Sequence, residues 1–117
     1  MKKILIVEDD INLNNMVLEH FTRNDLKCTQ AFSSTEALLC MQIQSYDLIL
    51  FDLMRQGMNG EDVLSKIIEK NNTPVIIVYA KDELDTNIDL LSLDAQDYIV
   101  KPFEIKELLA KVFAQLI

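Results

Sequence analysis

Four short apolar runs, each followed directly by polar residues, constrain the fold of this chain more than any other feature. The runs are Ile4–Val7, Leu48–Phe51, Pro74–Val78 and Tyr98–Val100. Short runs without polar alternation are typical of parallel strands that are buried on both faces. The carboxyl ends of such strands meet at one edge of an open α/β sheet, and ligands bind at that edge. We therefore expect the polar residues that follow the runs to lie close together.

Segments with helical periodicity separate the apolar runs. The predicted strands are Lys3–Val7, Lys27–Ala31, Asp47–Phe51, Pro74–Val78 and Asp97–Val100. The predicted helices cover residues 10–23, 33–45, 59–72, 85–93 and 103–116. Because Lys27–Ala31 carries polar residues, we expect it to be an outer strand of the sheet, paired on one side only. Five repeats of strand and helix with right-handed crossovers predict an α/β fold, a doubly wound five-stranded parallel sheet with five helices.

Three acids and a lysine are expected to meet at the carboxyl ends of the strands. Glu8 and Asp9 follow the first run, Asp52 follows the second, and Lys101 follows the last. Carboxylates about 4 Å apart repel one another by about 4 kcal/mol at an effective dielectric of about 20, so either one is protonated or a cation joins them. Oxygen ligands that leave room for water suit Mg²⁺, and an aspartate beside Mg²⁺ can attack an activated phosphate. The residues predict a Mg²⁺-dependent phosphoryl site.

Composition and charge exclude several other classes. The net charge of −8 is opposite to the basic face that binding of nucleic acid requires. Cys28 and Cys40 are too few and too unpatterned for a disulfide framework, and we expect reduced thiols. The start of the chain lacks the run of about 7–15 apolar residues of a signal peptide, and no stretch has the roughly 18 apolar residues of a membrane span. We expect a cytoplasmic protein that binds no membrane.

Three motifs resemble those of the receiver domain of a two-component response regulator. They are ILIVEDD at 4–10, DLILFDLMRQGMNG at 47–60 and DYIVKPF at 97–103. The resemblance covers nearly the whole chain, is strongest to the winged-helix (OmpR/PhoB-type) class, and implies the flavodoxin-like strand order 2-1-3-4-5. It implies that residues 1–117 form one receiver domain. Because the chain stops in mid-helix, it is compatible with the N-terminal part of a longer protein with a C-terminal DNA-binding domain.

The resemblance also implies a role for each matching residue. Asp52 would accept a phosphoryl group from a sensor histidine kinase, in a self-catalysed reaction rather than as a turnover enzyme. Asp9 and Asp52 would bind Mg²⁺ directly, Glu8 would act through water, and the backbone carbonyl of Met54 would be a further ligand. Lys101 would bind the phosphoryl group. The output implied is a switched interaction surface that controls transcription.

Two tyrosines occupy the family's switch positions. Tyr98 matches an aromatic residue that moves between buried and exposed states, although ordinary half-buried packing explains a tyrosine there equally well. At Tyr79 the family has Ser or Thr, whose hydroxyl contacts the phosphoryl group. A tyrosine oxygen lies about 6.5 Å from its Cα, too far out to replace that contact from the same backbone position. The alternative function is a degenerate receiver that acts as an interaction or dimerisation module without phosphorylation.

A dimer surface is implied by the same resemblance. Asp97, Glu107 and Lys111 are spaced as in winged-helix regulators that dimerise through the face formed by the fourth helix, the fifth strand and the fifth helix. Asn87 stands where those proteins usually carry a basic residue, so one salt bridge would be missing. Solvated surface charges explain the pattern equally well.

Two enzyme and cofactor classes with related features fit the sequence less well. A flavodoxin that binds FMN needs a phosphate loop rich in hydroxyls and glycine after the first strand, where this chain has Glu8-Asp9-Asp10. A phosphatase of the haloacid dehalogenase type needs a second aspartate two residues after Asp52, where this chain has Met54.

Overall fold

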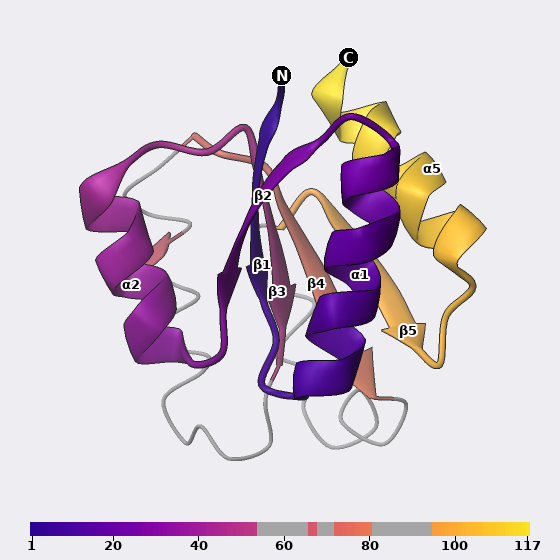
Figure 1. Ribbon diagram of the computed structural model, residues 1–117, viewed down its shortest axis with the longest axis horizontal. Coiled ribbons are helices and arrows are strands. Elements are labelled where there is room, and N and C mark those ends of the chain that lie inside the picture. The colour runs from indigo at the N-terminus through magenta and orange to yellow at the C-terminus, as the bar shows by residue number, and fades with distance from the viewer. Residues whose placement is uncertain (54–65, 68–71, 81–94) are drawn as a thin grey trace.

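Five parallel strands form a single sheet in the computed structural model, which describes residues 1–53, 66–67, 72–80 and 95–117. In chain order the elements are β1 (Lys3–Val7), α1 (Ile11–Arg23), β2 (Lys27–Ala31), α2 (Ser34–Ile43), β3 (Leu48–Asp52), β4 (Val75–Ala80), β5 (Asp97–Lys101) and α5 (Ile105–Leu116). The strand order is β2-β1-β3-β4-β5 (Figure 1). The predicted α/β class and strand order are confirmed, and β2 is an edge strand as expected.

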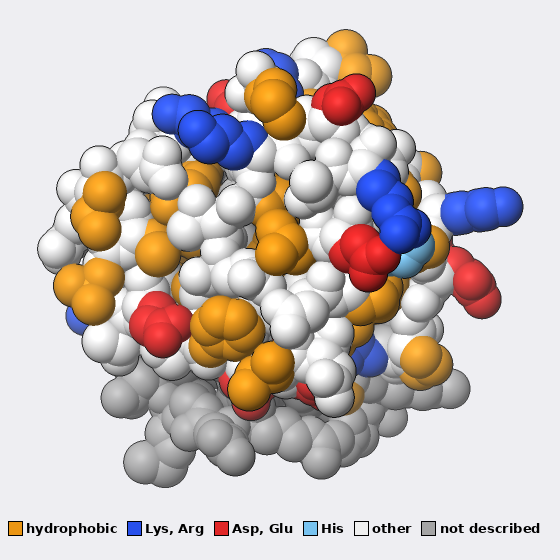
Figure 2. Space-filling view, viewed as in Figure 1, with side chains coloured by type: hydrophobic (Ala, Val, Ile, Leu, Met, Phe, Trp, Pro, Cys, Tyr) orange, Lys and Arg blue, Asp and Glu red, His pale blue; other side chains and the backbone are white. Residues whose placement is uncertain are grey.

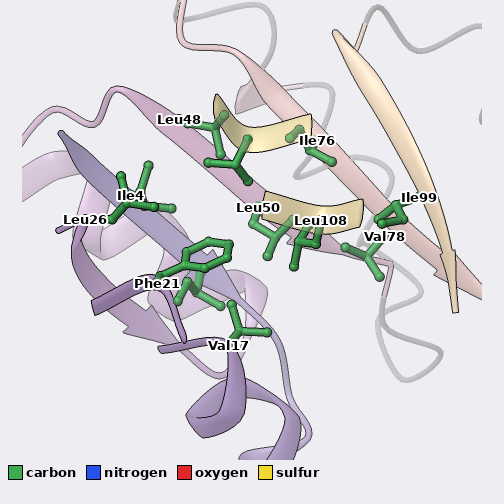
Figure 3. Close-up of a cluster of buried hydrophobic side chains, with 12 residues drawn as sticks. Ile4, Val17, Phe21, Leu26, Leu48, Leu50, Ile76, Val78, Ile99 and Leu108 are labelled. Atoms are coloured by element: carbon green, nitrogen blue, oxygen red, sulfur yellow. The ribbon is translucent and has the colours of Figure 1, made fainter. Parts of the chain in front are cut away.

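The two faces of the sheet bury separate apolar clusters because successive side chains of a strand point to opposite faces. On one face, Leu5 and Val7 of β1 pack with Ala37 of α2. On the other face, α1 and α5 cover the sheet (Figure 1). Phe21 of α1 and Leu108 of α5 pack against the strands there (Figure 3). The three central strands are therefore covered on both sides, which explains their uninterrupted apolar sequences.

Two of the helices begin at residues whose side chains cap them. The Asp10 side chain accepts a hydrogen bond of 3.1 Å from the Leu13 N–H at the start of α1. The Ser33 hydroxyl accepts one of 3.1 Å from the Glu36 N–H at the start of α2. Each cap satisfies a backbone donor that has no partner within its helix. The Asp10 cap also fixes the direction in which the chain leaves the end of β1, next to the acidic pair.

The outer face of α2 is more apolar than that of an ordinary surface helix. Leu39 and Ile43, one turn apart, are exposed to solvent. Figure 2 shows hydrophobic side chains on this side of the molecule, at the left where Figure 1 places α2. The apolar face explains why the helical periodicity of this segment is weak in the sequence.

The strands β3, β4 and β5 extend further toward their carboxyl ends than predicted. β3 includes Asp52, β4 includes Tyr79 and Ala80, and β5 includes Lys101. The reason is that backbone pairing continues past the apolar residues: Asp52 pairs with Val78 of β4. The polar side chains are therefore held by the sheet itself rather than by loops.

Parts of the predicted helices fall outside the described residues. Of the segment 59–72, the structure describes Lys66 and Ile67, which are helical, and Asn72. All of 85–93 lies outside, as do Met54 and Asn87. Within the described part of the chain, no helix has the length and apolar character needed to cross a membrane.

Candidate functional site

The carboxyl ends of β1, β3 and β5 bring Glu8, Asp52 and Lys101 into contact at the lower edge of the sheet in Figure 1. The Lys101 ammonium lies 3.0 Å from Glu8 Oε1 and also contacts Asp52 Oδ2 directly. These residues come together because β1 pairs with β3, β3 with β4, and β4 with β5, all in parallel, so the carboxyl ends of the strands lie at the same end of the sheet. Three of the residues singled out in the sequence therefore form one cluster, which we call the acid–lysine cluster.

The two acids of the acid–lysine cluster are almost fully removed from solvent. Glu8 is 4% exposed and Asp52 is 3% exposed, whereas the Lys101 side chain is 30% exposed. Apart from its ion pair with Lys101, the buried Asp52 Oδ2 accepts no hydrogen bond from the part of the chain that the structure describes. Two carboxylates against one ammonium leave a negative charge uncompensated where charge is costly to bury.

The two buried carboxyls have pKa values that move in opposite directions. Burial raises the pKa of Asp52, and the adjacent Glu8 raises it further, to about 9, although Lys101 acts against this. Burial acts in the same direction on Glu8, but hydrogen bonds from the Asp52 carboxyl and the Asp10 N–H outweigh it and lower the pKa of Glu8 to about 2. Without a further cation, the pair therefore keeps one proton, on Asp52, at neutral pH.

Asp9 and Lys101 respond to the same concentration of negative charge. Partial burial of its carboxyl and the neighbouring Glu8 raise the pKa of Asp9, although the residue as a whole is exposed to solvent. Burial lowers the pKa of Lys101, but hydrogen bonds and charges from Asp52 and Glu8 outweigh it and raise that pKa. Lys101 therefore remains an ammonium ion across the physiological range.

The carboxylate oxygens of the site are ligands that suit a hard divalent cation, but they are not arranged as a complete metal site. All the side-chain donors of Glu8, Asp9 and Asp52 are oxygens, which Mg²⁺ prefers, and Asp52 Oδ2 has its ion pair with Lys101 but no hydrogen-bond donor among the described residues. No three His, Cys, Asp or Glu side chains within those residues are arranged as a metal site. The Lys101 ammonium contacts one oxygen of Glu8 and one of Asp52, and so engages part of this donor set. The predicted ligand Met54 lies outside the described residues.

The two switch-position tyrosines lie on the α2 side of the sheet. Tyr79 and Tyr98 are both half-buried and pack against the apolar cluster on that face. They belong to neighbouring strands, with Tyr98 opposite Ile77 and Tyr79 opposite Val100. The half-buried position of Tyr98 does not decide between its two sequence interpretations.

A second charged pair lies on β5 and α5. The Lys111 ammonium donates to both carboxylate oxygens of Asp97, at 3.1 and 3.2 Å, and each side chain is about one-third exposed. These residues were singled out as a dimer surface, and here they pair within one chain. Glu107 is exposed on the same helix, and Asn87 lies outside the described residues.

Sequence reasoning missed one residue beside the acid–lysine cluster. Asn14, in the first turn of α1, is fully buried and donates to the Glu8 carbonyl at 2.9 Å. A signal was present, because Asn14 lies at helical spacing from the apolar Val17 and Phe21. A polar residue within an apolar helical stripe requires a buried hydrogen-bond partner.

Comparison with known protein sequences agrees with these observations. The family described as response regulator receiver domain matches residues 4–113. An uncharacterized transcriptional regulatory protein of Bacillus subtilis, YcbL, is 40% identical over 113 residues, which are 96% of this chain and 50% of that protein. The response regulator ArlR of Staphylococcus aureus is 38% identical over 116 residues, which are 99% of this chain and 53% of that protein. The chain thus spans about half the length of these relatives.

Solved structures of receiver domains share the fold. The receiver domain of the Francisella response regulator 1452 has 33% sequence identity and a TM-score of 0.87, covering 99% of this chain and 97% of that one. The response regulator TrrA of Thermotoga maritima, in complex with Mg²⁺-BeF, has 31% identity and a TM-score of 0.85, covering 99% of this chain and 100% of that one. This chain therefore belongs to the response regulator receiver domain family.

Proposed function

We propose that the domain is a phosphoacceptor in which Asp52 takes a phosphoryl group from a sensor histidine kinase in a Mg²⁺-dependent reaction. The observation that supports this most is the buried acid–lysine cluster, in which Lys101 contacts both Glu8 and Asp52. A carboxylate held beside a permanent ammonium at a ligand-binding sheet edge has the parts that phosphoryl transfer requires. The reaction consumes a phosphoryl donor and leaves the domain itself modified, so the domain does not act as a turnover enzyme.

In the transfer step, Asp52 is the nucleophile. An Asp52 carboxylate oxygen forms a bond to phosphorus while the bond from phosphorus to the donor's leaving group breaks, and the leaving group keeps the electron pair. Asp52 must be ionised to react, and its burial beside Glu8 opposes ionisation. Lys101 has three N–H donors on a flexible stem, so its ammonium can follow the negative charge from the carboxylate onto the new phosphoryl oxygens.

Mg²⁺ fits this proposal through the acids at the sheet edge. Asp9 and Asp52 would hold the ion directly, Glu8 through water, and the Met54 backbone carbonyl would complete the protein ligands. When bound, the ion supplies positive charge that offsets the carboxylate and phosphoryl oxygens. The TrrA structure, which contains Mg²⁺-BeF, supports such a site in a relative of this chain.

Labelling by a small phosphoryl donor tests the proposal without knowledge of the kinase. After incubation with acetyl phosphate and Mg²⁺, intact mass spectrometry is expected to show one added phosphoryl group per chain. With EDTA in place of Mg²⁺, we expect that fraction to fall to the level of a sample without donor. Equal labelling in EDTA would contradict the metal dependence.

The second candidate function is a degenerate receiver that acts as an interaction module without phosphorylation. Tyr79 is the specific observation in its favour, because it replaces the hydroxyl that reads the phosphoryl group. The two candidates share the fold and differ in whether phosphorylation changes the behaviour of the domain.

For the whole protein, we infer a cytoplasmic regulator of transcription. This chain covers 50% of YcbL, a transcriptional regulatory protein by name, which supports a further domain for binding DNA. The receiver itself, with a net charge of −8, is a poor partner for DNA phosphates. The proposed output is a homodimer formed through the face that carries β5, α5 and the predicted helix at 85–93.

Reversal of one charge tests that dimer surface. Lys111→Glu places a carboxylate beside Asp97, both within the chain and at any contact of this face with a second copy. Like charges across an interface oppose association, and we expect dimerisation to weaken by about tenfold or more, which corresponds to roughly 1.4 kcal/mol. Analytical ultracentrifugation at matched concentrations measures the dimer fraction. The same change at the exposed Lys106 of α5 is the charge-matched control.

One further variant separates a dimer effect from loss of the internal pair. The double exchange Asp97→Lys with Lys111→Asp restores the pair in both settings and is expected to recover dimerisation. An unchanged dimer fraction in Lys111→Glu, or no dimer in the phosphorylated wild type, would exclude this face.

A further inference from the structure

Both polar atoms of the Asn14 side-chain amide have hydrogen-bond partners, although the residue is not exposed to solvent. It is 0% exposed, and its Nδ2 donates to the Glu8 carbonyl at 2.9 Å and to the Ala31 carbonyl at 3.2 Å. Its Oδ1 accepts a hydrogen bond of 2.9 Å from Gln30 Nε2. A buried amide with partners on both of its polar atoms has one orientation, because a flip of the group would place donors against donors.

The acceptor at Glu8 belongs to the peptide unit that joins the two acids of the site. That unit is planar, so a hydrogen bond to its oxygen fixes the direction in which the chain enters Asp9. On the other side of the turn, the Asp10 N–H donates to Glu8 Oε2 at 3.0 Å. The hydrogen bond from Asn14 and the one from Asp10 together hold the turn from Glu8 to Asp10 against α1.

The Asn14 amide also connects this turn to β2, the outer strand of the sheet. The Ala31 carbonyl, at the end of β2, accepts from the Glu8 N–H at 3.0 Å as well as from Asn14. Gln30 of β2 also donates to Asn15 Oδ1 at 2.8 Å, so it is fixed by two residues of α1. The end of β1, the end of β2 and the first turn of α1 therefore meet at one buried side chain.

We propose that Asn14 is a positioning residue for the metal and phosphoryl site, which sets where the Asp9 carboxylate lies relative to Glu8 and Asp52. Its role at that site rests on the proposed function, whereas its hold on the turn does not. Groups that orient metal ligands through a hydrogen bond typically change metal affinity about 10–100-fold when they are removed. Asn14 acts through the peptide unit of its neighbour and does not touch the phosphoryl donor.

The test compares three variants of the full chain. Asn14→Leu keeps the side-chain volume close to native and removes both donated hydrogen bonds. Phe21→Leu disturbs a fully buried residue at the far end of the same helix, and so controls for loss of stability. Gln30→Ala removes the contact to Asn14 Oδ1 and leaves the two bonds donated by Asn14 in place.

Two measurements are made on each variant. The first is amide hydrogen exchange at Asp10 in metal-free protein, corrected for global stability, which we expect to accelerate about tenfold or more in Asn14→Leu alone, because its protecting acceptor lies in the released turn. The second is the Mg²⁺ concentration that gives half-maximal labelling by acetyl phosphate. We expect it to rise about 10–100-fold in Asn14→Leu and less than about threefold in the other two variants.

The outcomes separate a positioning role from a structural one. Equal effects of Asn14→Leu and Phe21→Leu on both measurements would show that Asn14 contributes only stability and would overturn the proposal. An effect of Gln30→Ala as large as that of Asn14→Leu would also overturn it, since the donated bonds would then not be the cause. If wild-type labelling does not depend on Mg²⁺, the proposed function fails, and the exchange at Asp10 still decides whether Asn14 holds the turn.

Discussion

Mg²⁺ is expected to raise the free energy of unfolding of the wild-type domain by about 2.7 kcal/mol when it is present at about 100 times its Kd. The reason is that the ion relieves the repulsion among Glu8, Asp9 and Asp52 and binds only when the folded sheet has brought them together. A variant with both Asp9→Asn and Asp52→Asn lacks two of the three carboxylates and is expected not to respond. Urea unfolding with Mg²⁺ and with EDTA measures both proteins. An equal gain in the double variant would place the metal elsewhere.

The same double variant has a second expected property in metal-free buffer. Folding raises the pKa of Asp52 from 3.8 to about 9 and also raises that of Asp9. Between these limits the folded wild type binds more protons than the unfolded chain, so its stability falls as the pH rises. The contribution of these groups is fully present below about pH 4 and is lost by about pH 9.

Because asparagine does not titrate, the double variant lacks this loss and keeps Glu8 beside Lys101. We therefore expect it to be more stable than wild type at neutral pH, with a difference that increases from pH 5 to pH 9. Urea unfolding at several pH values in EDTA measures the difference. A difference that shrinks with increasing pH would show that the buried acids are better compensated than the acid–lysine cluster indicates.

Tyr79→Thr is expected to enlarge the response of the domain to phosphorylation by about 10- to 100-fold in its two-state equilibrium. A phosphoryl group shifts that equilibrium only by its differential interaction with the two states. A charge-assisted hydrogen bond from a short hydroxyl, worth roughly 1.5–3 kcal/mol in one state alone, would supply this bias, and Tyr79 lacks it. In the proposed mechanism, phosphoryl transfer depends on Asp52, the metal acids and Lys101 and not on Tyr79, so we expect it to persist in wild type and variant.

The response is measured as the change in dimer fraction, or in amide exchange of the predicted helix at 85–93, at equal phosphate occupancy. Tyr79→Phe is the matched control, because it keeps the ring that packs against the α2-side cluster and offers no hydroxyl. It is expected to behave as wild type does. If wild type already responds as fully as Tyr79→Thr, then Tyr79 does not uncouple the switch.

The sequence predicted the sheet and the members of the acid–lysine cluster because both follow from local pattern. Buried parallel strands appear as short apolar runs, and the ends of such strands must share an edge. The contacts of Lys101 with both Glu8 and Asp52 could not be predicted, since they depend on side-chain rotamers at the ends of three strands. The strand order itself came from the family resemblance, because periodicity does not specify which strands are neighbours.

Other features escaped prediction because they depend on tertiary packing. Asp25 has a φ of 63°, a left-handed conformation, after the end of α1. Aspartate tolerates this conformation better than most residues, but its sequence context does not require it. Asp97 and Lys111 were interpreted either as part of a dimer surface or as solvated surface charges, and the pair that they form within one chain was not predicted. The role of Asn14 was not predicted because the acceptors of its amide are the backbone carbonyls of Glu8, just after β1, and of Ala31, at the end of β2.

The most direct test of the central claim is whether the phosphoryl group resides on Asp52. Wild type and Asp52→Asn are incubated with acetyl phosphate and Mg²⁺ under identical conditions, and their intact masses are compared. We predict one added phosphoryl group on the wild type and none on Asp52→Asn, with circular dichroism confirming that the variant is folded. A folded Asp52→Asn protein that is labelled as fully as wild type, or a wild type that is never labelled, would contradict the account.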